Sequence, residues 1–193
     1  MSIRTSCVSH IWKMSCIVPV PKKPVCTTMN DFRPVAMTSS VMKVFERLVL
    51  TDLQNKLANI VDPLQFAYRK NRSVEDAIIF VLNNVYEHLE HTGKYVRTMV
   101  FDFSSALNTI QPHLMANKLL NMHVNENTIL WILDYLTNRP QFVKLSNHMS
   151  SIMITNTGAP QGTVLSPFLF SVYTSDCHIN IPSCPIVKYA DDT

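Results

Sequence analysis

Residues 95–103, YVRTMVFDF, place one carboxylate near the end of a continuous apolar run. Such a run predicts a strand buried on both faces rather than a half-exposed one. Asp102 stands between two phenylalanines, and a carboxylate in such surroundings is costly unless it is paired or binds a metal ion. The alternative is a strand-end aspartate that caps the next turn through Ser104 and Ser105.

A second acidic position follows the segment IVKYA at residues 186–190, which predicts another strand. It ends in Asp191 and Asp192, and an adjacent acidic pair alone is common in solvated turns. If the two strands are neighbours in one sheet, however, three carboxylates converge at one edge. They would repel each other without cations, and carboxylates with substrate phosphates suit Mg²⁺. Two such ions about 3.5–4 Å apart can stabilise both the attacking and the leaving oxygen of a phosphoryl displacement.

The composition is that of one large domain or two small lobes, with 193 residues of which 47% are hydrophobic. A net charge of +3 permits nucleic-acid binding without arguing for it. The five cysteines form no CxxC pair and predict reduced thiols. The sequence shows neither a membrane-spanning stretch nor a signal peptide, so we expect an intracellular, soluble protein without a membrane partner.

The remaining pattern predicts helices and short strands in alternation. Residues 38–60 read as a helix with N-cap candidates at 38–40, and Ser73 to Asp76 resemble the capping box of the next helix. The expected inward faces of these two helices are Val41, Val44, Phe45, Leu48, Leu53, Leu57 and Ile60, and then Ala77, Ile78, Val81, Leu82, Val85 and Leu89. Further helices are expected at 112–122, 126–137 and from Ser166-Pro167 onward, with extended segments around 15–24 and strands at 141–145 and 151–155.

Five blocks of this sequence, in order, resemble the reverse transcriptases of non-LTR (LINE-type) retrotransposons. The resemblance runs from about residue 17 to residue 193. The blocks are NDFRPVAMTSSVMKVFERLV, QFAYRKNRSVEDAI, FDFSSALNTI, GAPQGTVLSPFLFSVYTSDC and YADDT.

The resemblance implies an α+β right-hand polymerase fold with helical fingers and a palm built on an antiparallel sheet. Residues 1–94 would form the fingers and 95–193 an incomplete palm, with a fingers-like excursion at about 122–157. The family's thumb would be absent, and we expect the chain to be cut just after YADD and to be inactive alone. The alternatives are a non-catalytic remnant, a weak RNA-binding module, or an RNA-templated RNA polymerase.

By resemblance, the activity is RNA-directed DNA polymerisation, in which a primer 3′-hydroxyl attacks a deoxynucleotide on an RNA template. Asp102, Asp191 and Asp192 would be the catalytic, metal-binding carboxylates, with the carbonyl of Phe103 as a further ligand. Two Mg²⁺ ions are implied, and Mn²⁺ would substitute. The partners would be an RNA template, a DNA primer and dNTPs in nucleus and cytoplasm; the oligomeric state stays open.

The resemblance also assigns nucleotide-binding residues. Lys22, Lys23 and Arg33 would grip the triphosphate, since lysine acts as a point charge and arginine binds phosphate in a bidentate way. The alternative is a charged, solvated loop. Gln161 would lie near the sugar and the templating base, and Gly158 and Gly162 would let the backbone approach the substrate.

Template contact is implied for an aromatic and basic loop, through base faces and phosphates. Here a solvated basic loop is the alternative. The residues are Phe66, Tyr68, Arg69, Lys70 and Arg72.

One position departs from the family pattern. Where the family usually has an aromatic residue that blocks a 2′-hydroxyl, this chain has Leu107. Because leucine is shorter and more mobile, we expect relaxed sugar selectivity or a copy no longer selected for accurate synthesis.

Overall fold

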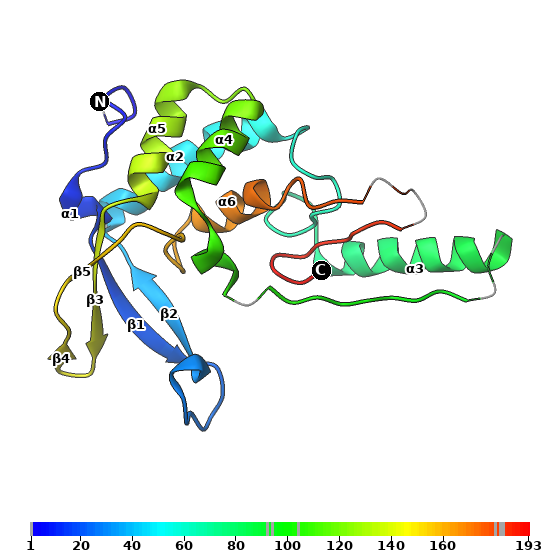
Figure 1. The fold of residues 1–193 in the computed structure, drawn as a ribbon, viewed down its shortest axis with the longest axis horizontal. Coiled ribbons are helices and arrows are strands. Elements are labelled where there is room, and N and C mark those ends of the chain that lie inside the picture. Colours follow the sequence, from blue (N-terminus) through cyan, green and yellow to red (C-terminus); the bar gives the residue numbers. More distant parts are fainter. Residues whose placement is uncertain (1, 92, 94, 104, 180, 182–183) are drawn as a thin grey trace.

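The computed structural model describes residues 2–91, 93, 95–103, 105–179, 181 and 184–193, so Ser104 lies outside the described residues. Figure 1 shows a compact helical body, two strand pairs that project from it on one side, and a long arm on another. The elements are α1 (His10–Lys13), β1 (Ser15–Pro21), η1 (Met29–Asp31), β2 (Phe32–Met37), α2 (Ser40–Leu57), α3 (Val74–His91), η2 (Ala106–Thr109), α4 (Pro112–Asn121), α5 (Glu126–Leu136), β3 (Arg139–Leu145), β4 (His148–Met149), β5 (Met153–Thr155) and α6 (Ser166–Tyr173).

The sheet is mixed, with the order β2-β1-β3-β4 and with β5 also paired to β3. β1 and β2 form an antiparallel hairpin, while β1 and β3 run parallel, with Ser15 opposite Gln141. The α+β class is therefore confirmed, and the sheet is mixed. The antiparallel sheet expected for the palm stays a prediction. A parallel neighbour requires a long crossover, and the helices between β2 and β3 supply it. The division into fingers and palm stays a prediction. In this sheet, β1 and β2 belong to the expected fingers, and β3, β4 and β5 belong to the expected fingers-like excursion at about 122–157.

The core lies between α2, α4, α5 and α6. Residues with no exposed surface include Met42 and Leu53 of α2, Leu119 of α4, and Leu136 and Leu169 of α5 and α6. Trp131 and Tyr135 stack in α5, with ring centroids 5.7 Å apart. Aromatic and branched side chains of this size dominate the burial energy of a small domain.

The predicted inward face of α2 is only partly right. Leu53 and Leu57 are buried, but Val41, Val44, Leu48 and Ile60 are each about half exposed. The buried face instead runs through Met42, Glu46 and Val49. The prediction from apolar periodicity missed this face because Glu46 lies at its centre, and glutamate is almost never buried without a partner.

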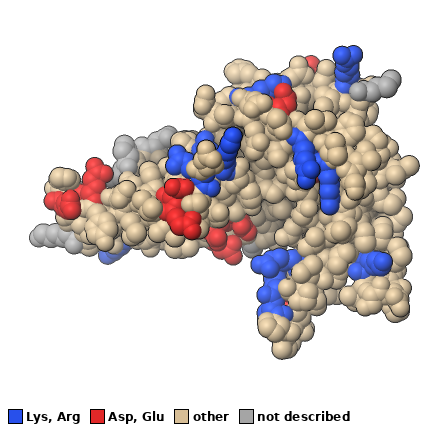
Figure 2. Space-filling view, turned by 180° about the vertical axis from the view of Figure 1, so that it is seen from behind, with Lys and Arg blue, Asp and Glu red and all other residues tan. Residues whose placement is uncertain are grey.

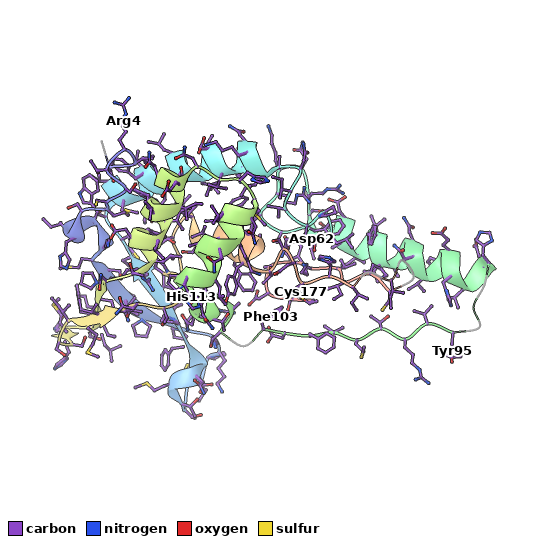
Figure 3. All side chains as sticks on the ribbon, turned by 45° about the horizontal axis from the view of Figure 1, so that its top comes forward. Arg4, Asp62, Tyr95, Phe103, His113 and Cys177 are labelled. Carbon is purple, nitrogen blue, oxygen red and sulfur yellow. The ribbon has the colours of Figure 1, made fainter. Side chains whose placement is uncertain are left out.

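The predicted buried strand at 95–103 is wrong. The segment is extended, but its only ladder contact among described residues is one bridge at Asp102, and Val100 is 81% exposed. Figure 3 marks its two ends, Tyr95 and Phe103, and shows it running beside α3 away from the body. The predicted apolar stripe of α3 is also less buried than expected: Ala77 is buried, Val81 and Val85 are partly buried, and Ile78, Leu82 and Leu89 are exposed. Most apolar side chains of this arm therefore remain at the surface.

The helix starts follow the sequence closely. The Ser39 side chain accepts a hydrogen bond from the amide of Met42 at 3.2 Å and caps α2. Before α3, Ser73 and Asp76 exchange side-chain and backbone hydrogen bonds, as the predicted capping box requires. The helices expected at 112, 126 and 166 begin where predicted. Among the described residues, no helix has the length and apolar character needed to cross a membrane.

Candidate functional site: an acidic hairpin beside the glycine loop

The two separated acidic positions of the sequence meet in one antiparallel ladder. Phe101 and Thr193 exchange both backbone hydrogen bonds, at 2.6 and 2.9 Å, and the amide of Phe103 donates to the Asp191 carbonyl at 3.3 Å. Asp102 and Asp192 are therefore directly opposite each other as a non-hydrogen-bonded pair. Side chains in such pairs share one face and lie close together.

The acidic pair itself forms a tight turn. Tyr189 and Asp192 exchange backbone hydrogen bonds of 2.9 and 3.1 Å, so Ala190 and Asp191 form a two-residue loop. Ala190 has a φ of 59°, which a primed hairpin turn demands at this position. The expected strand 186–190 is reduced to single bridges at Lys188 and Tyr189.

Two of the three predicted carboxylates are thus brought together. Asp191 directly precedes Asp192, the partner of Asp102, so its side chain points to the opposite side of the ladder. Its charge acts on Tyr68. The pKa of Tyr68 is raised first by burial and next by the negative charge of Asp191. Within the described residues, no group of three His, Cys, Asp or Glu side chains is close enough to hold a metal ion. The oxygen donors present suit a hard cation such as Mg²⁺, and like-charge repulsion opposes closer approach without one.

Phe103 fixes the position of Asp102. Its ring meets that of the buried Phe170 of α6 edge to face, with centroids 5.9 Å apart. Asp102 and Asp192 are exposed, so their carboxylates are open to solvent while the neighbouring ring reaches the core. No hydrogen bond joins Asp102 to Ser105, the described member of the alternative turn cap.

The loop between α2 and α3 supports the acidic turn from beneath. Lys188, with 1% of its surface exposed, pairs with Asp62 across 2.5 Å and donates to the carbonyls of Thr174 and Cys177. Figure 3 shows Asp62 and Cys177 on the two segments that this lysine connects. The Asp62 Oδ2 contact is an ion pair without hydrogen-bond geometry, while its Oδ1 accepts from the amide of Leu64. A buried lysine needs this number of partners.

The glycine loop, residues 157–165, packs against the turn that follows Asp102. The amide of Ala159 donates to the carbonyl of Leu107 at 2.8 Å. Gly158 has a φ of +69°, and a Cβ there would lie 2.9 Å from the Asn108 Cα. From the other side, the buried Arg139 donates to the carbonyls of Thr157 and Gly158. The small residue at 158 thus permits contact between two protein segments, and its expected role in approach to the substrate stays a prediction.

Glu46 caps α6 through the same loop. Its Oε2 accepts from the amides of Val164 at 2.6 Å and Leu165 at 3.0 Å, and its side chain is fully buried. These amides are at the helix start, where unpaired N–H groups and the dipole favour a carboxylate. Burial raises the pKa of Glu46, and the two amides oppose the rise. Nothing in the local sequence pattern marks Glu46 beyond its position as a carboxylate within an apolar helix face.

Replacing Glu46 should alter stability in a pH-dependent way. Because the folded-state pKa lies above the unfolded one, the contribution of Glu46 is full at low pH and is lost as pH rises through the raised pKa. Glu46→Gln keeps an acceptor for both amides and should flatten this decline in urea unfolding between pH 4 and 8. Glu46→Ala leaves two amides unpaired and should lower the unfolding free energy by about 2–5 kcal/mol. The exposed Glu87→Gln is the control; parallel pH curves for Glu46→Gln and wild type would contradict the assignment.

The predicted triphosphate cations lie on the β1–β2 hairpin. Lys22, Lys23 and Arg33 are exposed, and Figure 2 shows Lys and Arg side chains on this projection. Lys23 pairs with Asp31 at 2.8 Å. That ion pair, with amides of Thr27 and Thr28, holds the pKa of Asp31 well below its usual range. No ion pair joins these cations to the acidic hairpin in the part of the chain that the structure describes.

The remaining predicted nucleotide-binding residues, Gln161, Gly162 and Leu107, are in the glycine loop and in the turn that contacts it. The Gln161 carbonyl accepts from Ala36 of β2 at 2.6 Å, and a Cβ at Gly162 would meet the Val35 side chain at 3.0 Å, so the glycine loop also touches the hairpin. Leu107 is partly buried in η2 against the core.

Most side chains of the predicted template-binding loop make contacts within the protein. Phe66 is 3% exposed and packs on Phe80, with Arg72 over its ring, so its faces are closed to a base. Arg69 donates to the carbonyls of Asp62 and Ala58. Tyr68, which is 46% exposed, is the aromatic residue of this loop that remains accessible.

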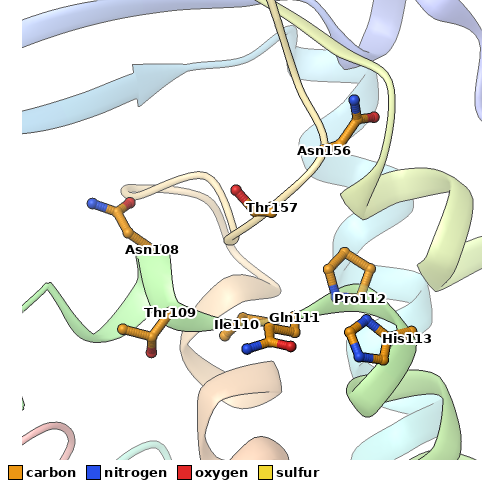
Figure 4. A pocket seen from close by; sticks show the side chains of 8 residues that line it. All are labelled: Asn108, Thr109, Ile110, Gln111, Pro112, His113, Asn156 and Thr157. Atoms are coloured by element: carbon orange, nitrogen blue, oxygen red, sulfur yellow. The ribbon is translucent and has the colours of Figure 1, made fainter.

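A separate hollow of about 490 Å³ lies beyond η2 (Figure 4). None of the residues predicted for catalysis or for nucleotide or template binding lines it. Its lining comprises Asn108, Thr109, Ile110, Gln111, Pro112, His113, Asn156 and Thr157.

The architecture is similar to part of two solved telomerase structures. A solved telomerase of Candida Tropicalis, in complex with a fragment of telomeric RNA, matches 96% of this chain and 36% of its own, with a TM-score of 0.60 and 12% identity. The apo telomerase of the same organism, truncated from its C-terminal domain, matches 88% of this chain and 39% of its own, with a TM-score of 0.57 and 15% identity. At these identities the likeness establishes the fold alone.

Residues 20–193 match the family model described as reverse transcriptase (RNA-dependent DNA polymerase), so the chain belongs to the reverse transcriptase family. The RNA-directed DNA polymerase from mobile element jockey of Drosophila melanogaster is 28% identical over 94% of this chain. The polyprotein of the type-1 retrotransposable element R1 of Bradysia coprophila is 27% identical over 94%. These relatives confirm the non-LTR resemblance. The chain spans 21% and 18% of their lengths, about a fifth in each case.

Proposed function

We propose that this chain is the part of an RNA-directed DNA polymerase that carries its catalytic carboxylates. The proposal rests on one observation, the direct opposition of Asp102 and Asp192 in the antiparallel ladder of a reverse transcriptase family member. Asp102 and Asp192 are far apart in sequence, and no hydrogen bond between their side chains explains why two like charges are placed opposite each other. Both side chains are open to solvent, so the pair offers accessible oxygen ligands to a divalent cation.

In the proposed reaction, the primer 3′-oxygen forms a bond to the α-phosphorus of a deoxynucleotide as the bond to pyrophosphate breaks. Asp102 and Asp192 would hold Mg²⁺, with Asp191 and the carbonyl of Phe103 as further oxygen donors. Bound there, Mg²⁺ or Mn²⁺ would supply charge stabilisation for the attacking and leaving oxygens. The role of this chain would be to hold these oxygen donors on a turn at the surface, where the end of a primer strand can reach them.

The nucleotide would lie between the acidic hairpin and the β1–β2 hairpin. Lys22, Lys23 and Arg33 offer exposed cations for its phosphates. The loop with Gln161 contacts both β2 and the turn with Leu107, and so connects these two regions. Among the predicted template residues, Tyr68 and Lys70 are the ones we retain, because Phe66 is buried and Arg69 binds backbone carbonyls.

A chimera tests the proposal in a complete polymerase. Residues 20–193 replace the matching segment of the jockey polymerase, and the isolated chain is assayed in parallel. With an RNA template, a DNA primer, dNTPs and Mg²⁺, the chimera should extend the primer, and EDTA should abolish extension. Ribonucleotide extension that is faster than deoxynucleotide extension, which relaxed sugar selectivity alone would not produce, would favour an RNA polymerase. A folded chimera that binds primer and template without extending the primer would support a non-catalytic remnant.

The sugar selectivity of the chimera should depend on Leu107. Leu107→Phe places a planar ring beside the glycine loop and should lower the relative rate of ribonucleotide incorporation by about 10–100-fold, the range expected of one shape contact. Single-nucleotide insertion with dNTP and rNTP measures the ratio. Leu114→Phe, on an exposed part of α4, is the matched control. An unchanged ratio for Leu107→Phe would remove this residue from the sugar contact.

A further inference from the structure

We propose that Gln65 is a positioning residue for the acidic turn, an inference that rests on the proposed function. Its side chain is fully buried beneath the hairpin. Nε2 donates to the carbonyl of Ala190 at 3.2 Å, and Oε1 accepts from the amide of Ala190 at 3.1 Å. One amide group therefore holds both polar backbone groups of the residue that precedes Asp191.

The orientation of this amide is fixed by a third partner. Oε1 also accepts from the amide of Ala67 at 3.1 Å, so the oxygen faces two N–H donors and the nitrogen faces a carbonyl. Of the common side chains, a glutamine is suited to donate and accept at once in this way. A glutamate at this position would present a second acceptor to the Ala190 carbonyl and add a buried charge.

The residue held by Gln65 is under conformational strain. Ala190 adopts the left-handed region, with a φ of 59°, where side chains other than glycine are disfavoured. The hydrogen bonds to Gln65 offset this strain and select the turn over extended alternatives. Because the next two residues are Asp191 and Asp192, the turn conformation sets where both carboxylates project.

The neighbouring backbone reinforces the same contact. The amide of Lys188 donates to the carbonyl of Leu64, and the amide of Phe66 donates to the carbonyl of Lys188, both at 2.9 Å. Gln65 is thus fixed in a parallel bridge directly beneath the hairpin. We name residues 64–66 the turn support. Its burial and contacts explain why this part of the aromatic and basic loop is not available to a template.

Hydrogen exchange tests the structural part of this inference. Gln65→Asn keeps the amide but shortens its reach, and Gln65→Glu keeps the length but loses the donor. Both should speed exchange in peptides covering residues 188–193 by about tenfold or more, as expected when a buried hydrogen bond is lost. Peptides from α4 and α5 should be unchanged. The exposed Gln54→Asn and Gln54→Glu are the matched controls.

Kinetics of the same variants in the jockey chimera test the link to the proposed function. A loosened turn should lower kcat about tenfold or more and raise the half-saturating Mg²⁺ concentration, with the dNTP KM within about twofold, since misplaced donors weaken charge stabilisation rather than nucleotide binding. Loss of activity only in proportion to the unfolded fraction would overturn the positioning role. So would unchanged exchange at residues 188–193 in folded Gln65→Asn. If Asp102→Asn were active, the proposed function would fail, whereas the exchange result would still stand or fall separately.

Discussion

Asp102→Asn should lower RNA-templated primer extension by the jockey chimera by about a hundredfold or more, because removal of one preorganised electrostatic group commonly costs that much. Asparagine matches aspartate in shape and keeps one oxygen, but it lacks the negative charge needed to balance a divalent cation. Asp102 is exposed and makes no side-chain ion pair with described residues, so folding should be little affected. Single-turnover extension at saturating Mg²⁺ and dNTP gives the measurement.

The matched control for this variant is Asp52→Asn. Asp52 is on the exposed face of α2 and pairs with Lys56 one turn later. It should retain activity within about twofold, since such surface pairs contribute little. Equal activity of Asp102→Asn and Asp52→Asn, with both proteins folded, would remove Asp102 from the reaction.

Lys188→Met should lower the unfolding free energy by about 3–5 kcal/mol, the range found when one partner of a buried ion pair is removed. The substitution leaves Asp62, itself 7% exposed, without its cation and leaves two carbonyls without a donor. For a chain of this size the loss corresponds to a decrease in the unfolding midpoint of about 6–20 °C. Urea and thermal unfolding measure both quantities.

A double substitution separates burial of charge from loss of packing. Lys188→Met with Asp62→Leu removes both charges and should recover the part of the lost stability that is due to the unpaired carboxylate, because a buried pair is often replaced by apolar residues at little cost. The carbonyls of Thr174 and Cys177 still lack this donor in the double variant. Lys56→Met breaks an exposed pair and should change the unfolding free energy by less than about 1 kcal/mol. If Lys188→Met behaves like Lys56→Met, the buried ion pair is not important for stability.

Local signals predicted the helices well. Ser39, Ser73 and Pro167 are at helix starts because capping depends on residues within one turn. The inward face of α2 was less predictable. Glu46 is buried because the amides of a helix more than a hundred positions later need an acceptor, and no pattern within α2 records that partner.

The acidic ladder was predictable and its surroundings were not. Apolar runs before Asp102 and Asp191 indicated two strands that meet, and the ladder brings Asp102 and Asp192 together. Their burial was overestimated, because an apolar run shows that a strand can be covered without showing that a described element covers it. Lys188 lies inside an apolar run of the sequence, and this position indicates a buried cation. Gln65 gave no such signal, since a glutamine in a loop has many uses.

The parallel pairing of β1 with β3 also constrains how the chain is made. Ser15 leaves the ribosome long before Gln141, its neighbour in the finished sheet. During this interval the β1–β2 hairpin has one open edge of unpaired backbone groups, the kind of surface that recruits other strands. Sheets that depend on such distant pairing form slowly. Chaperone capture during synthesis would therefore act mainly on the first half of the chain, before β3 closes that edge.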